Sequence, residues 1–93
     1  MISKKLSIAI PTYNRLVYLK ECINSILNQT FQDFSIFIFD NASREPIEKE
    51  LNQFNDKRIH FIGSNKNMPQ AENFKRIEKY PFKSEYLIVF HDD

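Results

Sequence analysis

Four short apolar runs, separated by segments with helical periodicity, are the feature that most constrains the fold of this chain. Each run is rich in β-branched and aromatic residues and is bounded by polar or turn-forming residues, which is typical of buried strands. We expect these strands at residues 6–10, 35–39, 58–62 and 86–90. Pro11 should end the first of them, because proline cannot continue a central ladder.

The segments between the strands predict three helices. In the first, residues 15–29, the apolar side chains recur at helical spacing, with Asn14 as the expected N-cap. The second starts near Pro46 and runs to about residue 55, and the third follows Pro69 with Asn67 as its expected cap. Because helices alternate with strands, we expect a parallel sheet with right-handed crossovers and helices on both faces.

This topology brings four polar segments to one edge of the sheet. They are residues 11–15, 40–43, 63–67 and 91–93, each directly after a predicted strand. Ligands of open α/β sheets bind at this carboxyl edge. The last segment holds the adjacent carboxylates Asp92 and Asp93, which repel each other unless a positive charge lies nearby. A hard divalent cation that also binds phosphate would supply it, and a solvated acidic turn is the alternative.

Composition excludes several classes of function. The net charge of +1 argues against a basic stripe that would bind nucleic acid, and the lone Cys22 excludes an internal disulfide. With Gly63 as its one glycine, the chain has neither a Walker loop nor a GxGxxG turn. The apolar run before Pro11 is too short for a signal peptide. We therefore expect the 93 residues to form one small domain or part of a larger one, in the cytoplasm, with the inner face of the membrane as a second location.

Five segments, in order and together, resemble the family 2 glycosyltransferases of the GT-A fold. They are residues 6–15, 19–34, 39–43, 67–73 and 90–93, of which the last resembles the metal-binding DxD motif of the family. The resemblance covers essentially the whole chain. One departure is the absence of the glycine that the family has near Met68 and Pro69.

The resemblance implies a GT-A, Rossmann-like α/β/α fold with strand order 3-2-1-4. It implies inverting transfer of a sugar from a UDP-, GDP- or dTDP-sugar to an acceptor hydroxyl, with Mn2+ or Mg2+, in polysaccharide or glycoconjugate synthesis. Residues 1–93 would be the donor-binding half of the domain. The acceptor half and the catalytic base would lie beyond residue 93, so we expect these residues alone to be inactive.

The resemblance also assigns roles to single residues. Asp40 would accept a hydrogen bond from the nucleobase, or else cap its own turn with Ser43. Tyr13 would lie against the base, or plug the end of the sheet. The other expected contacts are backbone groups of Pro11 and Thr12 to the base, Arg15 to a phosphate or to Glu21, Asn73 to the donor, Asp92 to ribose or sugar, and Asp93 to the metal. We expect Arg76 to lie on a solvated surface.

Two other classes of protein remain as alternatives. A flavodoxin-like signalling domain needs an acidic pair after the first strand and a phosphoacceptor after the third. Those places hold residues 11–14 and 63–65, which carry no carboxylate, so this class ranks lower. The other is a non-catalytic nucleotide-binding α/β module, which residues beyond 93 would distinguish from an enzyme.

Overall fold

The computed structural model of the chain describes residues 5–90. Strands and helices alternate as expected, and a short 3-10 helix extends the second helix. The elements are β1 (Leu6–Thr12), α1 (Leu16–Leu27), β2 (Phe34–Asp40), α2 (Ile47–Leu51), η1 (Asn52–Phe54), β3 (Ile59–Ile62), α3 (Gln70–Lys79) and β4 (Tyr86–Val89).

The strands form one parallel sheet in the order β3-β2-β1-β4. This confirms the order expected for the fold. β1 and β2 are the two central strands, and their pairing runs from Leu6↔Phe34 to Thr12↔Asp40. All four strands therefore end at the same edge of the sheet, and the loops that follow them meet there.

Pro11 does not end β1, which corrects the sequence interpretation. The carbonyl of Ala9 accepts a hydrogen bond from Phe90 on the β4 side, whereas the carbonyl of Thr12 accepts one from Asn41 on the β2 side. Since backbone groups alternate in direction along a strand, Pro11 faces the β4 side. Pairing with β4 stops at Ala9↔Val89, so the missing N–H of proline removes no ladder bond.

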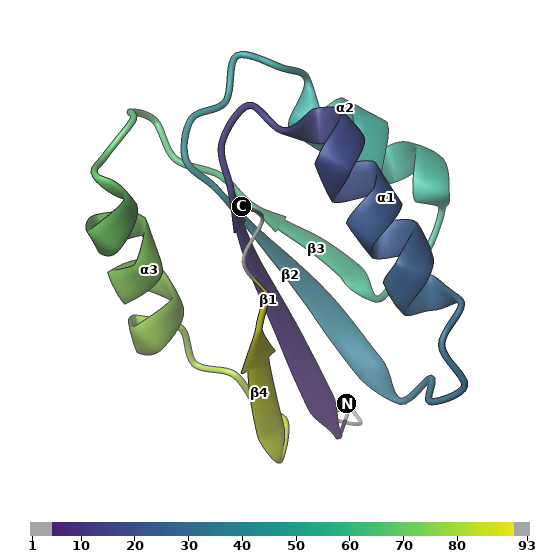
Figure 1. Cartoon of the computed structure of the whole chain (residues 1–93). Helices are drawn as coiled ribbons and strands as arrows, with labels where there is room; N and C mark the ends of the chain where they lie inside the picture. Colours follow the sequence, from purple (N-terminus) through teal and green to yellow (C-terminus); the bar gives the residue numbers. More distant parts are fainter. Residues whose placement is uncertain (1–4, 91–93) are drawn as a thin grey trace.

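Helices cover both faces of the sheet: α1 and α2 lie on one side and α3 on the other (Figure 1). The α1/α2 layer, as we call that side with its core, is largely aliphatic. Its buried residues include Ile8, Ile10, Leu19, Ile23, Ile26, Phe34, Ile36, Ile38, Ile47 and Leu51. On the other side, which we call the α3 layer, Ala9, Phe39 and Ile77 are buried beneath the rings of Phe37, Tyr80 and Phe82.

β4 differs from the expected strand that is buried on both faces. Tyr86, Leu87 and Ile88 are 61%, 44% and 43% exposed. The reason is topological: within residues 5–90, β4 has a paired neighbour only in β1 and forms an edge of the sheet. No helix in that described part is long and apolar enough to cross a bilayer.

Candidate functional site

A cleft of about 430 Å³ opens at the carboxyl edge of the sheet, between the end of β1 and the start of α3. Its floor comes from β1 and the residues that follow it, and its far wall comes from the loop before α3. The residues that line this cleft are Pro11, Thr12, Tyr13, Arg15, Asn41, Asn67, Met68, Pro69, Gln70 and Asn73.

Asp40 lies beside the cleft, at the end of β2, with only 5% of its surface exposed. Both carboxylate oxygens accept hydrogen bonds from Ser43: the backbone N–H reaches Oδ2 at 3.1 Å, and the hydroxyl reaches Oδ1. Ala42 completes this tight turn with a positive φ of 56°. Asp40 thus fixes the turn after β2, as the alternative interpretation of the sequence expected.

Asn14 joins this turn to the end of β1 rather than capping α1, which corrects the expected N-cap. Its backbone N–H donates to Ser43 Oγ at 2.8 Å, and its Oδ1 accepts from the N–H of Arg44 at 2.7 Å. Instead, Glu45 Oε1 accepts the N–H of Leu16 at the start of α1, at 2.9 Å. The loops after β1 and β2 are therefore held as one unit.

Asn41 ties the loop before α3 to the end of β2. Its Nδ2 donates to the carbonyl of Met68 at 2.7 Å, and its Oδ1 accepts the N–H of Met68 at 2.8 Å. Asn67 Nδ2 donates to the carbonyl of Asn41 at 3.1 Å. The sequence predicted that Asn67 would cap α3, but α3 has no side-chain cap. These bonds set the distance between the end of β2 and the loop before α3, which both contribute residues to the cleft.

Arg76 and Asn73 on α3 bind the carboxyl ends of β2 and β3. Asn73 is 3% exposed and donates to the carbonyl of Phe39 at 3.1 Å. Arg76 donates to Asn73 Oδ1 and to three backbone carbonyls. Burial lowers the pKa of the Arg76 guanidinium from its ordinary value, and the charge of Asp40 partly opposes this shift. The expected solvated position of Arg76 is therefore wrong.

Three residues of the cleft floor leave groups available to a ligand. Tyr13 is 41% exposed. Arg15 is exposed and lies 5.6 Å from the centre of the Tyr18 ring; within the described chain its expected partner Glu21 makes no ion pair with it. Among residues 5–90, Thr12 Oγ1 is buried without a hydrogen-bond partner, an arrangement that is rare in proteins.

Comparison with known proteins decides the family. The model of the family "Glycosyl transferase family 2" matches residues 7–93. The chain belongs to this family. A beta-1,3-glucosyltransferase of Campylobacter jejuni, named for GalNAc(5)-diNAcBac-PP-undecaprenol, is 34% identical over 96% of this chain. The chain spans 29% of the length of that relative.

Solved glycosyltransferase structures share the fold. S. aureus TarS, crystallised in complex with UDP-GlcNAc, superposes with a TM-score of 0.75 at 22% identity, over 96% of this chain and 26% of that one. The mannosyltransferase PcManGT from Pyrobaculum calidifontis, in complex with GDP-Man and Mn2+, gives a TM-score of 0.69 at 13% identity, over 83% of this chain and 24% of that one. The expected GT-A fold is thereby confirmed.

The structure brings most of the expected site residues of this family 2 chain to one place. Pro11, Thr12, Tyr13, Arg15 and Asn73 all line the cleft, and Asp40 lies next to it. Asp92 and Asp93 lie outside the described residues. Within residues 5–90, no three His, Cys, Asp or Glu side chains come together as a metal-binding group.

The role of Asn41, the bond from Asn67 to the Asn41 carbonyl and the bonds of Arg76 were not expected from the sequence. Polar residues in predicted loops were the only signal for the two asparagines, and nothing in the helical pattern distinguished Arg76 from a surface residue. All three act through backbone groups of distant segments, which periodicity does not indicate.

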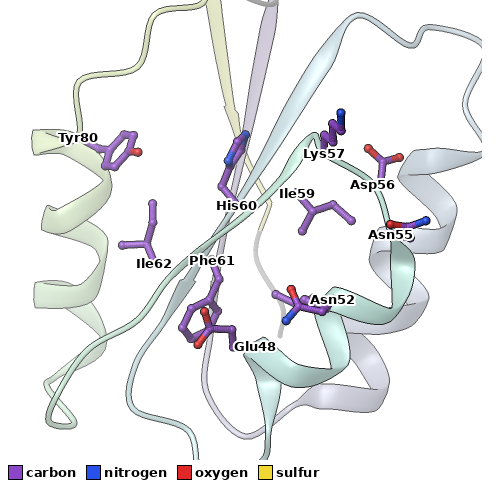
Figure 2. A pocket seen from close by; sticks show the side chains of 11 residues that line it. Glu48, Asn52, Asn55, Asp56, Lys57, Ile59, His60, Phe61, Ile62 and Tyr80 are labelled. Atoms are coloured by element: carbon purple, nitrogen blue, oxygen red, sulfur yellow. The ribbon is translucent and has the colours of Figure 1, made fainter.

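A second cavity, of about 530 Å³, lies along β3 (Figure 2). Its lining side chains come from both faces of this edge strand: Ile59 and Phe61 pack toward the α1/α2 layer, and His60 stacks on Phe37 on the other face. His60 is exposed at this edge of the sheet. Because this cavity wraps around the side of a strand and lies away from the carboxyl-edge loops, we take the cleft as the functional site.

Proposed function

We propose that this chain is the part of a glycosyltransferase that binds a nucleotide-diphosphate sugar, the donor of an inverting transfer to an acceptor hydroxyl. The observation that carries the proposal is the cleft at the ends of β1 and β2, with an exposed aromatic ring and a carboxylate beside it. The structures of similar fold support it, because TarS was crystallised in complex with UDP-GlcNAc and PcManGT is in complex with GDP-Man and Mn2+.

In this proposal the nucleobase binds at the β2 side of the cleft. Asp40 uses two of its about four lone-pair positions on Ser43, which leaves acceptor capacity for a base N–H. The ring of Tyr13 offers a flat apolar surface for the base. Backbone groups of Pro11 and Thr12 border the base, and a ligand that reaches the Thr12 hydroxyl would satisfy it.

The diphosphate and sugar extend toward the β4 side. Arg15 is exposed in the cleft floor and provides a cation for a phosphate, and Asn73 also lines the cleft. β4 is parallel to β1 and therefore also ends at the carboxyl edge of the sheet. Asp93 would hold Mn2+ or Mg2+ and Asp92 would bind ribose or sugar, since both offer the hard oxygen ligands that such ions prefer. The ion would offset the charge that develops on the departing diphosphate.

The transfer itself needs groups from elsewhere in the parent protein. An acceptor hydroxyl attacks the anomeric carbon, its proton goes to a carboxylate base, and the nucleoside diphosphate departs with the bonding electrons. We assign residues 1–93 to donor binding, and acceptor and base to further residues, because this chain spans 29% of its C. jejuni relative. Residues 1–93 alone would then transfer no sugar to an acceptor. Polysaccharide or glycoconjugate synthesis at the cytoplasmic side of a membrane is the proposed setting.

Titration calorimetry on the parent protein tests the proposal. UDP, GDP and dTDP are titrated with Mn2+ or with EDTA into the wild type, Asp40→Ala and Asp93→Asn. Asp40→Ala should weaken nucleotide binding with or without metal by ~1.5–3 kcal/mol, the value of a hydrogen bond to a charged group. Asp93→Asn should abolish the metal dependence.

Asp33→Asn is the matched control, because Asp33 is exposed at the opposite end of β2. It should bind nucleotide like the wild type. A wild-type protein that binds none of the three nucleotides would rule out the donor site. A protein that binds them but never converts a nucleotide sugar with an acceptor would instead favour the non-catalytic nucleotide-binding module.

A further inference from the structure

Arg76 occupies an unusual place for an arginine on the polar side of an amphipathic helix. Its Nη1 donates to the carbonyl of Asp40 at 3.2 Å and to Asn73 Oδ1 at 2.8 Å. Its Nη2 donates to the carbonyls of Ile62 at 3.1 Å and Gly63 at 2.7 Å. Four of the five N–H donors of the guanidinium group are therefore used within the protein.

These bonds begin where strand pairing stops. The last pair between β2 and β3 is Phe39↔Ile62, and the carbonyls of Asp40 and Gly63 lie one residue beyond it. The guanidinium group also lies 5.8 Å from the centre of the Phe39 ring. Arg76 thus takes the place of further ladder bonds and holds the ends of the two strands together.

The bond to Asp40 connects Arg76 to the cleft. The carboxylate of Asp40 fixes the turn that contains Ser43, and the next residue, Asn41, holds Met68 in the opposite wall by two bonds. Asn73, which accepts from Arg76, lines the cleft itself. A shift of the Asp40 backbone would therefore move Asn41 and, with it, the loop at Met68.

We propose that Arg76 is a positioning residue for the base-binding end of the cleft: it fixes the backbone of Asp40, and through it Asn41 and the loop at Met68, without contacting the ligand. The proposal rests on the proposed function, since it assumes that a nucleobase binds there. With four donors already bound to protein acceptors, the guanidinium group has one N–H left and is poorly placed to receive a phosphate.

The test compares a nucleoside with its diphosphate. Arg76→Lys keeps the positive charge but loses the forked geometry that reaches several carbonyls at once. Affinities for uridine and UDP, or for guanosine and GDP, should fall by the same factor, roughly 2- to 30-fold, the range over which residues without ligand contact modulate binding. In turnover by the parent protein, the donor KM should rise by that factor with kcat unchanged.

Lys75→Ala is the matched control, because Lys75 is an exposed cation next to Arg76 on α3; it should change neither affinity. Arg76→Gln, which keeps two N–H donors, is the second variant and should show the same equal loss. Thermal melting of each variant sets a temperature at which the protein is folded, so that affinity and stability are measured separately.

Wild-type affinity for both ligands in folded Arg76→Lys would overturn the proposal and leave Arg76 a purely structural role. A loss confined to the diphosphate would also overturn it, because Arg76 would then touch phosphate. NMR of the wild type also tests whether Arg76 contacts phosphate, without a variant. The side-chain nitrogen resonances of Arg76 should shift equally with uridine and UDP. A wild type that binds neither nucleoside nor diphosphate would instead refute the proposed function.

Discussion

The two layers that flank the sheet are built from different chemistry. The α1/α2 layer is a closely packed aliphatic core, in which Leu19, Ile23, Ile36 and Ile38 are 0% exposed. The α3 layer has fewer buried aliphatic residues and is bound to the sheet by aromatic rings and by side-chain hydrogen bonds from Asn73 and Arg76. Hydrophobic burial is non-directional, whereas hydrogen bonds fix positions and angles.

This difference suggests a division of roles. The α1/α2 layer supplies most of the free energy of folding, and the α3 layer sets the geometry of the cleft. Substitutions in the two layers should then differ in kind: those in the first should lower stability alone, and those in the second should lower stability and change nucleotide binding together.

The largest expected effect comes from a matched pair of isoleucines. Ile23 on α1 is 0% exposed and Ile77 on α3 is 1% exposed. Each change to alanine should lower the free energy of unfolding by about 2–5 kcal/mol, through lost burial and the cavity left behind. Ile77→Ala should also weaken UDP or GDP binding, because Ile77 follows Arg76 on α3. Urea denaturation measures the loss of stability and calorimetry the nucleotide affinity; equal affinity in the two variants would contradict the division of roles between the layers.

A smaller loss is expected for Asn73→Ala. The change leaves the carbonyl of Phe39 without its partner in a buried position, which costs about 1–3 kcal/mol. Asn24→Ala, on the exposed face of α1, is the control and should stay within about 0.5 kcal/mol of the wild type. Chemical denaturation checks both; a neutral Asn73→Ala would mean that water replaces the amide.

Tyr13→Ala should leave stability nearly unchanged and weaken nucleotide binding by about 0.5–1.5 kcal/mol, the value of an aromatic stacking contact. Tyr13→Phe should retain the affinity, because the ring is kept. Tyr86→Ala serves as the control, since Tyr86 is 61% exposed on β4. If calorimetry shows no loss for Tyr13→Ala, the ring only covers the end of the sheet.

The smallest effect is expected at the ion pair between Lys20 and Glu50, which joins α1 to α2 at 3.0 Å. Partly exposed pairs contribute about 0–1 kcal/mol. Lys20→Ala should therefore shift the denaturation midpoint slightly and leave nucleotide affinity unchanged. A change in affinity would show that the α1/α2 layer also influences the cleft.

The fold was largely predictable from the sequence because its signals are periodic. Apolar runs and helical spacing located the strands and helices of residues 5–90, and parallel crossovers brought the loops to one edge. Pro11 was misinterpreted because a pattern does not show which neighbour a backbone N–H faces. The exposure of β4 was missed for a similar reason, since an apolar run does not reveal whether a second strand lies beside it.

The candidate site was predictable in position but not in its supporting bonds. Tyr13 follows β1 and Asp40 ends the neighbouring strand β2, so topology alone brings them to the same edge of the sheet. The double bond of Asn41 to Met68 and the bonds of Arg76 to three carbonyls join segments that are distant in sequence. Such contacts depend on tertiary geometry and leave no periodic signal.

Binding of a nucleoside diphosphate in the carboxyl-edge cleft can be observed directly by NMR titration of the isotope-labelled protein with UDP and GDP. We expect shifts at the amides of Tyr13, Asn41 and Met68, with Asn55 and His60 beside the cavity of Figure 2 unchanged. Shifts confined to Asn55 and His60, with the cleft amides unmoved, would contradict it.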